Sequence, residues 1–441
     1  MINIIDKILL IVIYLLFGLI VAIMNIYMMK KNKKLSVNIL LNGYFSLVYI
    51  ITPICVLIKN GKIPYYIYTN NIKYYYWILI NAIASYVALN IGYSIRIKDE
   101  NYSKEKCRNL LLSGYVLLAI GWIALFLWTK AYGSLVGIFK YSSLIRSGYV
   151  IIYNKYTFLK PFCAILLFSF AIFYSKLLGL KNYNLLKKCL TIIGLIFSTI
   201  GSYIYIIAND GRMIIILILL TVIMPLIEKK NNKINLRKII GYIICGIIMI
   251  IILGQLDNVT YYLKNKKRRK VEDNNNIITI IADELGYTYS NNININYLRN
   301  EGVINEYTLF SDIKNIMFAW VPQRFKPKDV INLFDYNTTF YKRTTGQIPT
   351  DIITASIYKF GIIGVIILPL IVGIFFKILE KKIFKKREKS DYYLVTAYLI
   401  TTYLGLRFIA YYDLSQILFG SFYIIISIII VKIISKINMD R

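Results

Sequence analysis

The sequence predicts an all-α, polytopic integral membrane protein with about 11 transmembrane helices and one long extracytoplasmic loop. Three observations predict this class. Of the 441 residues, 58% are hydrophobic, and lysine and arginine gather between the apolar runs. Those runs are about 20 residues long, which is the length a helix needs to cross the hydrocarbon core. We expect helices 1–8 in residues 1–256, the loop in 257–351 and helices 9–11 in 352–441.

Each expected span is a window of mostly apolar residues. The windows are 8–29, 38–58, 74–95, 109–128, 158–178, 189–207, 212–227, 239–256, 352–379, 392–412 and 417–434. Basic clusters follow the first, third, fifth, seventh and ninth windows. They contain Lys30, Lys31, Lys33 and Lys34; Arg96, Lys98, Lys104, Lys106 and Arg108; Lys181, Lys187 and Lys188; Lys229, Lys230, Lys233, Arg237 and Lys238; and Lys381, Lys382, Lys385, Lys386, Arg387 and Lys389. Because basic loops stay in the cytoplasm, we expect a cytoplasmic (inner) membrane protein with its N-terminus outside and its C-terminus cytoplasmic.

Composition excludes several classes of function. The net charge of +31 would suggest nucleic acid in a soluble protein, but here the cations orient helices and meet anionic membrane lipids. The chain has no histidine, which excludes a histidine base, a histidine metal site and a Ser-His-Asp triad. Its cysteines form no CxxC pair, and it has no phosphate-binding glycine loop. We therefore expect no nucleic-acid partner, no cofactor and no metal.

Two arginines lie in or at the start of apolar windows, where a charge is costly and usually functional. Arg212 opens an apolar run directly after Asp210 and Gly211, at the outer face of the expected topology. Arg407 lies more than a turn inside the outer end of the tenth window, which ends before Asp413. A guanidinium matches phosphate oxygens with a fork of donors. Snorkelling into the headgroups is the alternative for both, and a structural pair with Asp413 is a further one for Arg407.

The outer loop is several times longer than an ordinary connection, and such loops usually carry function. Lys264–Lys270 is a dense basic run, which either lies on anionic headgroups or attracts an anionic lipid-linked substrate. Residues 281–334 mix apolar and polar side chains as surface-lying helices do, with Trp320 and Phe325 as interfacial anchors. We expect this part to form a lid. A second outer segment, 129–157, contains Arg146.

Three motifs follow one another in the second half of the chain. Residues 320–328 read Trp-Val-Pro-Gln-Arg-Phe-Lys-Pro-Lys, residues 344–351 read Thr-Thr-Gly-Gln-Ile-Pro-Thr-Asp, and the ninth window carries Phe360-Gly361-Ile362-Ile363-Gly364. Their order, the large outer loop and the Gly-Arg opening of the seventh window resemble the Wzy-type oligosaccharide repeat-unit polymerases of O-antigen and capsule assembly. The resemblance covers about residues 208–373. Lys359 departs from it, because the family has an uncharged polar residue before Phe-Gly.

The resemblance implies a metal-independent glycosyltransferase that polymerises polyprenyl-pyrophosphate-linked oligosaccharide repeat units into O-antigen or capsular polysaccharide on the outer face. A chain-length regulator and a flippase are its expected partners. Positive charge then stabilises the pyrophosphate as it leaves, and an acceptor hydroxyl needs a base. The expected catalytic residues are Arg212, Arg407, Asp210, Asp413 and Asp351, with Asp283 and Glu284 in the same pool of carboxylates. The expected substrate-binding residues are Arg324, Arg343, Lys326, Lys328 and Arg146.

Other classes remain open from the sequence. A flippase of lipid-linked oligosaccharides or a polysaccharide exporter would also use intramembrane arginines, but it should carry charge along several spans. A ligase-like transferase shares the architecture, although the ligases known to us rely on an outer-loop histidine that this chain lacks. A structural assembly partner is the third alternative.

Overall fold

The structure, a computed structural model, describes residues 3–32, 36–59, 72–97, 109–135, 137–139, 141, 156–179, 184–209, 220–226, 228, 277–304, 309–318, 321, 325–327, 330–341, 347–383 and 390–437. Every regular element in these residues is helical, as the sequence predicts. The α-helices are α1 (Ile4–Asn32), α2 (Val37–Ser46), α3 (Thr52–Ile58), α4 (Ile72–Ser94), α5 (Leu110–Thr129), α7 (Lys160–Cys163), α8 (Ile165–Leu178), α9 (Leu185–Asn209), α12 (Ile277–Asn300), α13 (Leu309–Met317), α14 (Leu333–Thr339), α15 (Ile352–Phe360), α16 (Gly364–Ile383), α17 (Asp391–Ala410) and α18 (Leu414–Lys436).

Nine stretches of the described residues are long and apolar enough to cross a membrane. They are Ile4–Lys30, Val37–Ile58, Ile72–Ser94, Leu110–Tyr132, Lys160–Leu178, Leu185–Ile206, Ile352–Ile383, Asp391–Ala410 and Leu414–Lys436. These match nine of the expected windows. Window 212–227 is described mainly over residues 220–226, which are helical, and window 239–256 lies outside the described residues. The chain is therefore a polytopic α-helical membrane protein.

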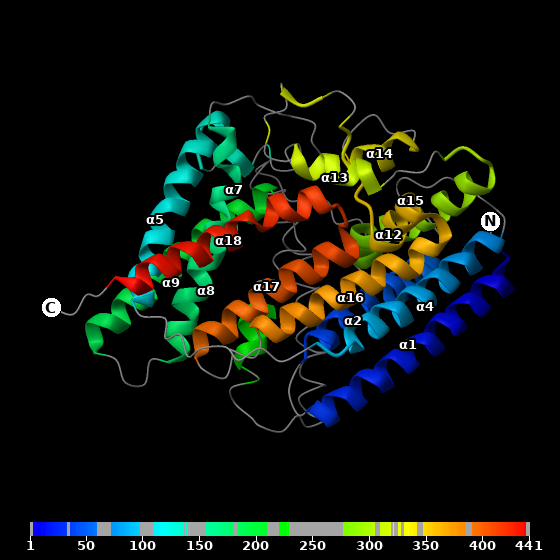
Figure 1. Ribbon diagram of the computed structural model, residues 1–441, viewed down its shortest axis with the longest axis horizontal. Coiled ribbons are helices and arrows are strands. Elements are labelled where there is room, and N and C mark those ends of the chain that lie inside the picture. Colours follow the sequence, from blue (N-terminus) through cyan, green and yellow to red (C-terminus); the bar gives the residue numbers. More distant parts are fainter. Residues whose placement is uncertain are drawn as a thin grey trace.

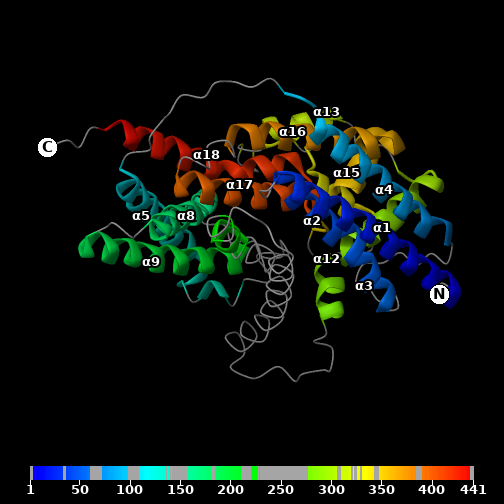
Figure 2. The same cartoon turned by 90° about the horizontal axis from the view of Figure 1, so that it is seen from below.

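The long helices give the bundle two ends, which are shown in Figures 1 and 2. Contacts between helix ends that are distant in sequence identify each of them. At the lysine end, defined by the start of α2 and the ends of α4, α16 and α18, the Val37 amide donates to Glu380 at 3.2 Å and Lys381 donates to the Ile97 carbonyl. At the site end, defined by α13, α14, α15 and the α17–α18 turn, the Tyr412 amide donates to the Thr350 carbonyl at 2.7 Å. The contacts at the lysine end therefore bring together helix ends that border basic clusters of the sequence. Which end faces the cytoplasm stays a prediction.

Helix α8 packs between α5 and α9 with large side chains set against glycines. Phe173 lies against one glycine of each neighbour, and Leu166 repeats the arrangement one heptad earlier. A missing side chain leaves a gap that an apolar neighbour can fill, and membrane helices use such small residues to approach closely. The glycines are Gly114 and Gly121 on α5 and Gly194 and Gly201 on α9.

Helices α4 and α16 touch backbone to backbone. A Cβ on Gly92 would lie 2.1 Å from the Leu370 carbonyl oxygen, so only glycine permits this approach. Pro369 lies inside α16 and lacks the amide that would bond the carbonyl one turn earlier. That carbonyl, of Val365, instead accepts a hydrogen bond of 3.0 Å from the Ser85 hydroxyl of α4. The close contact therefore also supplies a hydrogen bond to the carbonyl that Pro369 leaves without an intrahelical donor.

Asparagines join the first helices at the lysine-end half of the bundle. The Asn42 amide donates to Asn25 of α1 at 3.0 Å, and the Asn38 amide donates to Asn90 of α4 at 3.0 Å. Side-chain amides hydrogen-bonded between spans hold membrane helices together, because lipid offers them no other partner. This network fixes α1, α2 and α4 relative to one another.

Two expected spans are interrupted at the site end. Leu47–Ile51 forms a π-helical turn between α2 and α3, just before Pro53, and such turns often lie at functional sites. The window 352–379 is broken at Gly361, whose φ of 63° favours glycine. The chain then turns so sharply that a Cβ on Gly364 would lie 2.1 Å from the Ser356 carbonyl. Helix α16 alone has the length of a span, and α15 is a separate short helix at its end.

Helix α12 differs from the surface-lying helices expected in residues 281–334. It packs against α3, α4 and α15, and polar side chains such as Ser290, Asn291 and Asn292 are buried on it. Asn291 has a partner at the site end, since its side-chain amide donates to the Pro349 carbonyl at 2.7 Å. Helix α13 is closer to the expectation, because Ile313 and Met317 are exposed. Trp320 lies outside the described residues.

Replacing Gly92 by alanine tests the contact of α4 with α16. The added Cβ must push the Leu370 backbone away, and overpacking of this kind costs about 1–3 kcal/mol. We expect Gly92→Ala to lower the midpoint of thermal unfolding in detergent. Gly43 is the matched control, because a Cβ there meets nothing within 4 Å, so Gly43→Ala should not lower the midpoint. Equal midpoints for the two variants would contradict the crossing.

Candidate functional site

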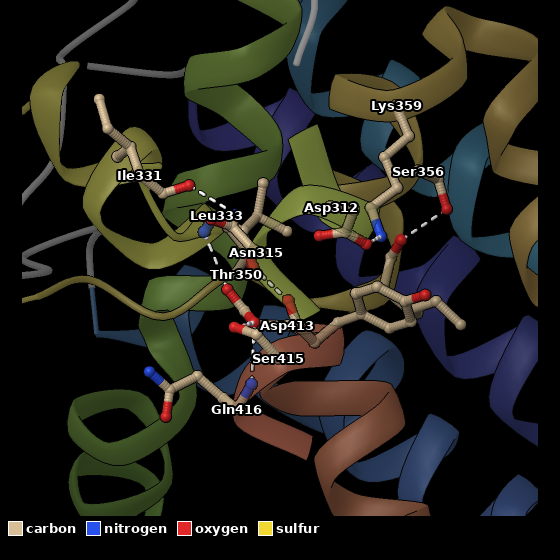
Figure 3. Close-up of polar contacts among 12 residues, drawn as sticks. Asp312, Asn315, Ile331, Leu333, Thr350, Ser356, Lys359, Asp413, Ser415 and Gln416 are labelled. Carbon is tan, nitrogen blue, oxygen red and sulfur yellow. Dashed lines mark hydrogen bonds and ion pairs between the residues drawn. The ribbon is translucent and has the colours of Figure 1, made fainter. Parts of the chain in front are cut away.

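The site is built around an ion pair between α15 and α13. Lys359 of α15 and Asp312 of α13 contact each other, and both side chains have 0% exposed surface. Figure 3 shows the two side chains pointing toward one another. The Lys359 ammonium also lies 4.4 Å from the centroid of the Tyr412 ring, a favourable cation–π distance. Removing one partner of a buried pair leaves an uncompensated charge, so the pair fastens α13 to α15.

One of the two carboxylate oxygens of Asp312 has no hydrogen-bond partner among the described residues. Its Oδ2 contacts Lys359, whereas its Oδ1 is buried and has no hydrogen-bond partner among the described residues. Burial raises the pKa of the Asp312 carboxyl, and the charge of Lys359 opposes this rise. A buried, unpaired oxygen is costly to keep. Such an atom is therefore a candidate for a group that acts on a ligand.

Asp413 joins α18 to the start of α14. It is fully buried, and its Oδ1 accepts hydrogen bonds from the Ser415 hydroxyl at 2.6 Å and from the backbone amide of Gln416 at 3.0 Å. Its Oδ2 accepts from the Leu333 amide at 2.8 Å. The sequence Asp-Leu-Ser-Gln is a helix N-cap, and Figure 3 shows the carboxylate between the two elements. Both oxygens of Asp413 are thus occupied.

Asp351 is the N-cap of α15. Its Oδ1 accepts from the Ile353 amide at 3.1 Å and from the Tyr49 hydroxyl at 2.6 Å. Its Oδ2 accepts from the Thr354 hydroxyl at 2.6 Å, and Asn292 of α12 donates to Oδ1 at 3.2 Å. Burial raises the pKa of the Asp351 carboxyl, although these hydrogen bonds oppose the rise. The π-helical turn that contains Tyr49 therefore positions the start of α15.

The residue before Asp351 is tied to the α17–α18 turn. The Thr350 hydroxyl donates to the Tyr412 carbonyl at 2.6 Å, and the Tyr412 amide donates back to the Thr350 carbonyl. The Tyr287 hydroxyl of α12 donates to the Ala410 carbonyl at 2.6 Å. These bonds hold the start of α15 and helix α12 against the α17–α18 turn, which carries Asp413.

Negative charge exceeds positive charge in this cluster, as far as the described residues show. Asp335 of α14 accepts from Asn332 at 2.6 Å and from Gln347 at 2.7 Å. Burial raises the pKa of the Asp335 carboxyl, the hydrogen bond from Gln347 opposes this, and the charge of Asp413 raises it further. Asp312 and Asp413 add two more carboxylates opposite one lysine. No group of three or more His, Cys, Asp or Glu residues in the described part could hold a metal ion.

Arg407 lies about one turn before the end of α17, close in sequence to this cluster. It is half-buried, and its guanidinium carbon is 5.3 Å from the centroid of the Tyr403 ring. The considered pair with Asp413 is not among the ion pairs between described residues. Its role in holding phosphate stays a prediction.

The structure brings together two of the expected catalytic residues, Asp351 and Asp413, near the helix end that carries Arg407. Lys326 is described and half-buried. Asp283 of the carboxylate pool pairs at 2.5 Å with Lys59, which directly follows α3, and is 46% exposed. Glu284 of the same pool is described on α12 and is half-buried. The remaining expected residues lie outside the described part of the chain: Asp210, Arg212, Arg146, Arg324, Lys328 and Arg343.

Sequence reasoning missed Asp312, Asp335 and Tyr49. Lys359 was noticed only as a departure from a motif, although a lysine in an apolar window is itself a signal of function. Asp312 gave no comparable signal, because it stands in an ordinary amphipathic stretch. Comparisons with protein-family models, curated proteins and solved structures found no match to this chain.

A double-mutant cycle measures the pair of Lys359 and Asp312. Lys359→Met should lower stability by about 3–5 kcal/mol, because it leaves the Asp312 carboxylate buried without its partner. The double variant Lys359→Met/Asp312→Leu should recover most of that loss, since two apolar side chains can replace a buried pair. The measurement is the midpoint of thermal unfolding in detergent for each corner of the cycle. A double variant as unstable as the sum of the single variants would show that the two side chains do not interact.

Proposed function

We propose that the chain is a membrane glycosyltransferase that polymerises polyprenyl-pyrophosphate-linked oligosaccharide repeat units into O-antigen or capsular polysaccharide. In this proposal it works at the outer face of the cytoplasmic membrane, as Wzy-type polymerases do. The order of motifs in residues 208–373 supports it. So does a bundle of apolar helices with a polar segment folded onto one end.

The observation that carries the proposal is the buried pair of Lys359 and Asp312 with its unoccupied carboxylate oxygen. We assign to Asp312 Oδ1 the proton of the acceptor hydroxyl. The hydroxyl oxygen then forms a bond to the anomeric carbon of the growing glycan. The bond from that carbon to the pyrophosphate oxygen breaks, and its electron pair leaves with the lipid pyrophosphate. A positioned carboxylate can act as the general base for such a proton transfer.

Asp312 suits the role of base better than the carboxylates expected from the sequence. The oxygens of Asp351 and Asp413 already accept hydrogen bonds from backbone amides and hydroxyls. Those contacts favour a structural role for both residues, as helix caps. Asp283 is half-exposed and paired with Lys59.

Access to Asp312 requires α13 to move, because the carboxylate has no exposed surface. Helix α13 is suited to such a motion, since Ile313 and Met317 on its outer side are 46% and 71% exposed. In the proposed cycle α13 is the lid. When it lifts, the ion pair opens, Asp312 meets the acceptor, and Lys359 becomes free to face an anion.

The pyrophosphate itself needs cations. A cluster with more carboxylates than lysines would repel it, so we assign the phosphate oxygens to Arg407 and Arg212, with Lys359 joining them after the lid opens. A planar guanidinium bonds two phosphate oxygens at once. Preorganised positive charge in a site shielded from water stabilises the leaving group most effectively.

Transport of the same lipid-linked saccharide is the main alternative. A carrier should expose charge along several spans to move an anionic head group. The fully buried carboxylates among the described residues, Asp312, Asp351 and Asp413, all lie at the site end. This distribution favours chemistry at one membrane face over passage through the bundle. A ligase-like transfer to a different acceptor would use the same base and cations.

The polymerisation activity of variants at Asp312, Lys359 and Arg407 tests the proposal. We expect the double variant Lys359→Met/Asp312→Leu to fold and yet to make no polymer, because both reacting groups are gone. Asp312→Asn should lower the polymerisation rate by about 10²–10⁴-fold, the usual contribution of a general base. Arg407→Lys should fail nearly as badly as Arg407→Ala, because lysine loses the bidentate fit. The readout is the glycan ladder on lipid carriers in cells that carry each variant at equal membrane abundance.

Two control variants come from the same polar segment. Asp283→Asn removes a half-exposed carboxylate, and Arg299→Lys changes an exposed arginine at the end of α12; both should make normal polymer. Full-length polymer from the double variant would remove Asp312 and Lys359 from the mechanism. Repeat units that accumulate on the cytoplasmic face would point to a flippase instead.

A further inference from the structure

A groove of about 650 Å³ lies between the long helices at the lysine end, which is opposite the site end. Helices α16, α17 and α18 form its sides, and Phe168 of α8 contributes to its lining. Ile400 and Ile428 belong to its apolar wall, and Lys382, Lys432 and Lys436 supply its positive charge. A volume of this size is typical of pockets that bind small molecules.

The groove runs along the membrane-spanning direction and opens sideways. Its lining on α18 extends from Ile428 to Lys436, which is about 12 Å along a helix axis. Phe168 and Ile400 are buried. Ile429 and Ile433, which also line it, are 49% and 59% exposed. An extended hydrocarbon chain can therefore enter from the bilayer and lie against apolar side chains over two turns of α18.

The three lysines have no acidic partner among the described residues. Two hydroxyl groups of the lining already have backbone partners. The Thr396 hydroxyl donates to the Tyr392 carbonyl at 2.7 Å, and the Ser435 hydroxyl donates to the Lys432 carbonyl at 2.8 Å. Among the described residues, the ammonium groups therefore remain for a ligand, and they favour an anionic one.

We propose that this groove binds one anionic glycerophospholipid of the leaflet at the lysine end. The lipid phosphate lies between Lys382, Lys432 and Lys436, and one acyl chain lies between α17 and α18. Lysines at helix ends are also expected simply to orient a membrane protein. That role gives no reason for a two-turn apolar groove that ends at three ammonium groups without an acidic partner in the described part of the chain. The proposal does not depend on the chain's catalytic function.

Lipid retention by the purified full-length protein tests the site. Native mass spectrometry in detergent, after addition of phosphatidylglycerol or phosphatidylcholine, counts the lipids that stay bound. We expect the wild-type protein to retain one phosphatidylglycerol and at least ten-fold less phosphatidylcholine. The variant Lys382→Gln/Lys432→Gln/Lys436→Gln should lose at least ten-fold of the phosphatidylglycerol. Lys432→Gln alone should show an intermediate loss, which keeps the test valid if the triple variant does not fold.

Two further variants separate the groove from general surface charge. Lys187→Gln/Lys188→Gln removes two lysines of α9 that line no part of the groove, and it should retain lipid as the wild type does. Ile428→Trp keeps all three lysines but fills the groove, so it should lose the lipid. Wild-type retention by Ile428→Trp or by the triple variant would overturn the proposal. Equal retention of phosphatidylcholine, or preferential retention of added polyprenyl phosphate, would overturn it as well.

Discussion

A lysine and an aspartate without exposed side-chain surface meet where the polar segment folds back onto the apolar helices. Burying both charges is costly, and their mutual contact and the Tyr412 ring offset part of that cost. The rest of the site end follows from this constraint. α15 must break from α16 at Gly361, the Asp351 cap must fix its start, and the Thr350–Tyr412 bonds must hold the segment in place. The polar segment is therefore part of the bundle end.

The spans were the predictable part of this fold. Lipid makes a helix of about 20 apolar residues the only simple way to cross, so nine windows could be located from composition alone and agree with the structure. The breaks inside windows were less visible. The glycines at 361 and 364 were visible as part of a motif, but the sharp turn between α15 and α16 depends on a close approach to the Ser356 carbonyl that no local pattern encodes. Helix α12 misled for a similar reason, because polar side chains such as Asn291 and Asn292 find buried partners on distant segments.

The candidate site was only half predictable. Asp351 and Asp413 stand directly before apolar helices, and this position marks them in the sequence, although as caps more than as reacting groups. Lys359 was visible as a charge within an apolar window. Its partner was not, because Asp312 is remote in sequence and only the fold brings α13 to α15. The proposal of an enzyme combines this geometry with the resemblance of motifs, while the lipid groove at the opposite end rests on shape and charge alone.

The central claim is that the Lys359–Asp312 pair fastens the polar segment to the membrane helices. Hydrogen exchange of the backbone amides in detergent tests it most directly, by comparing the wild type with Lys359→Met. The account predicts slow exchange in α13 and α14 of the wild type, and much faster exchange in those helices of the variant. Exchange in α5, α8 and α9, which pack through their own glycine contacts, should stay unchanged. Fast exchange in α13 of the wild type, or equal exchange in both proteins, would contradict the account.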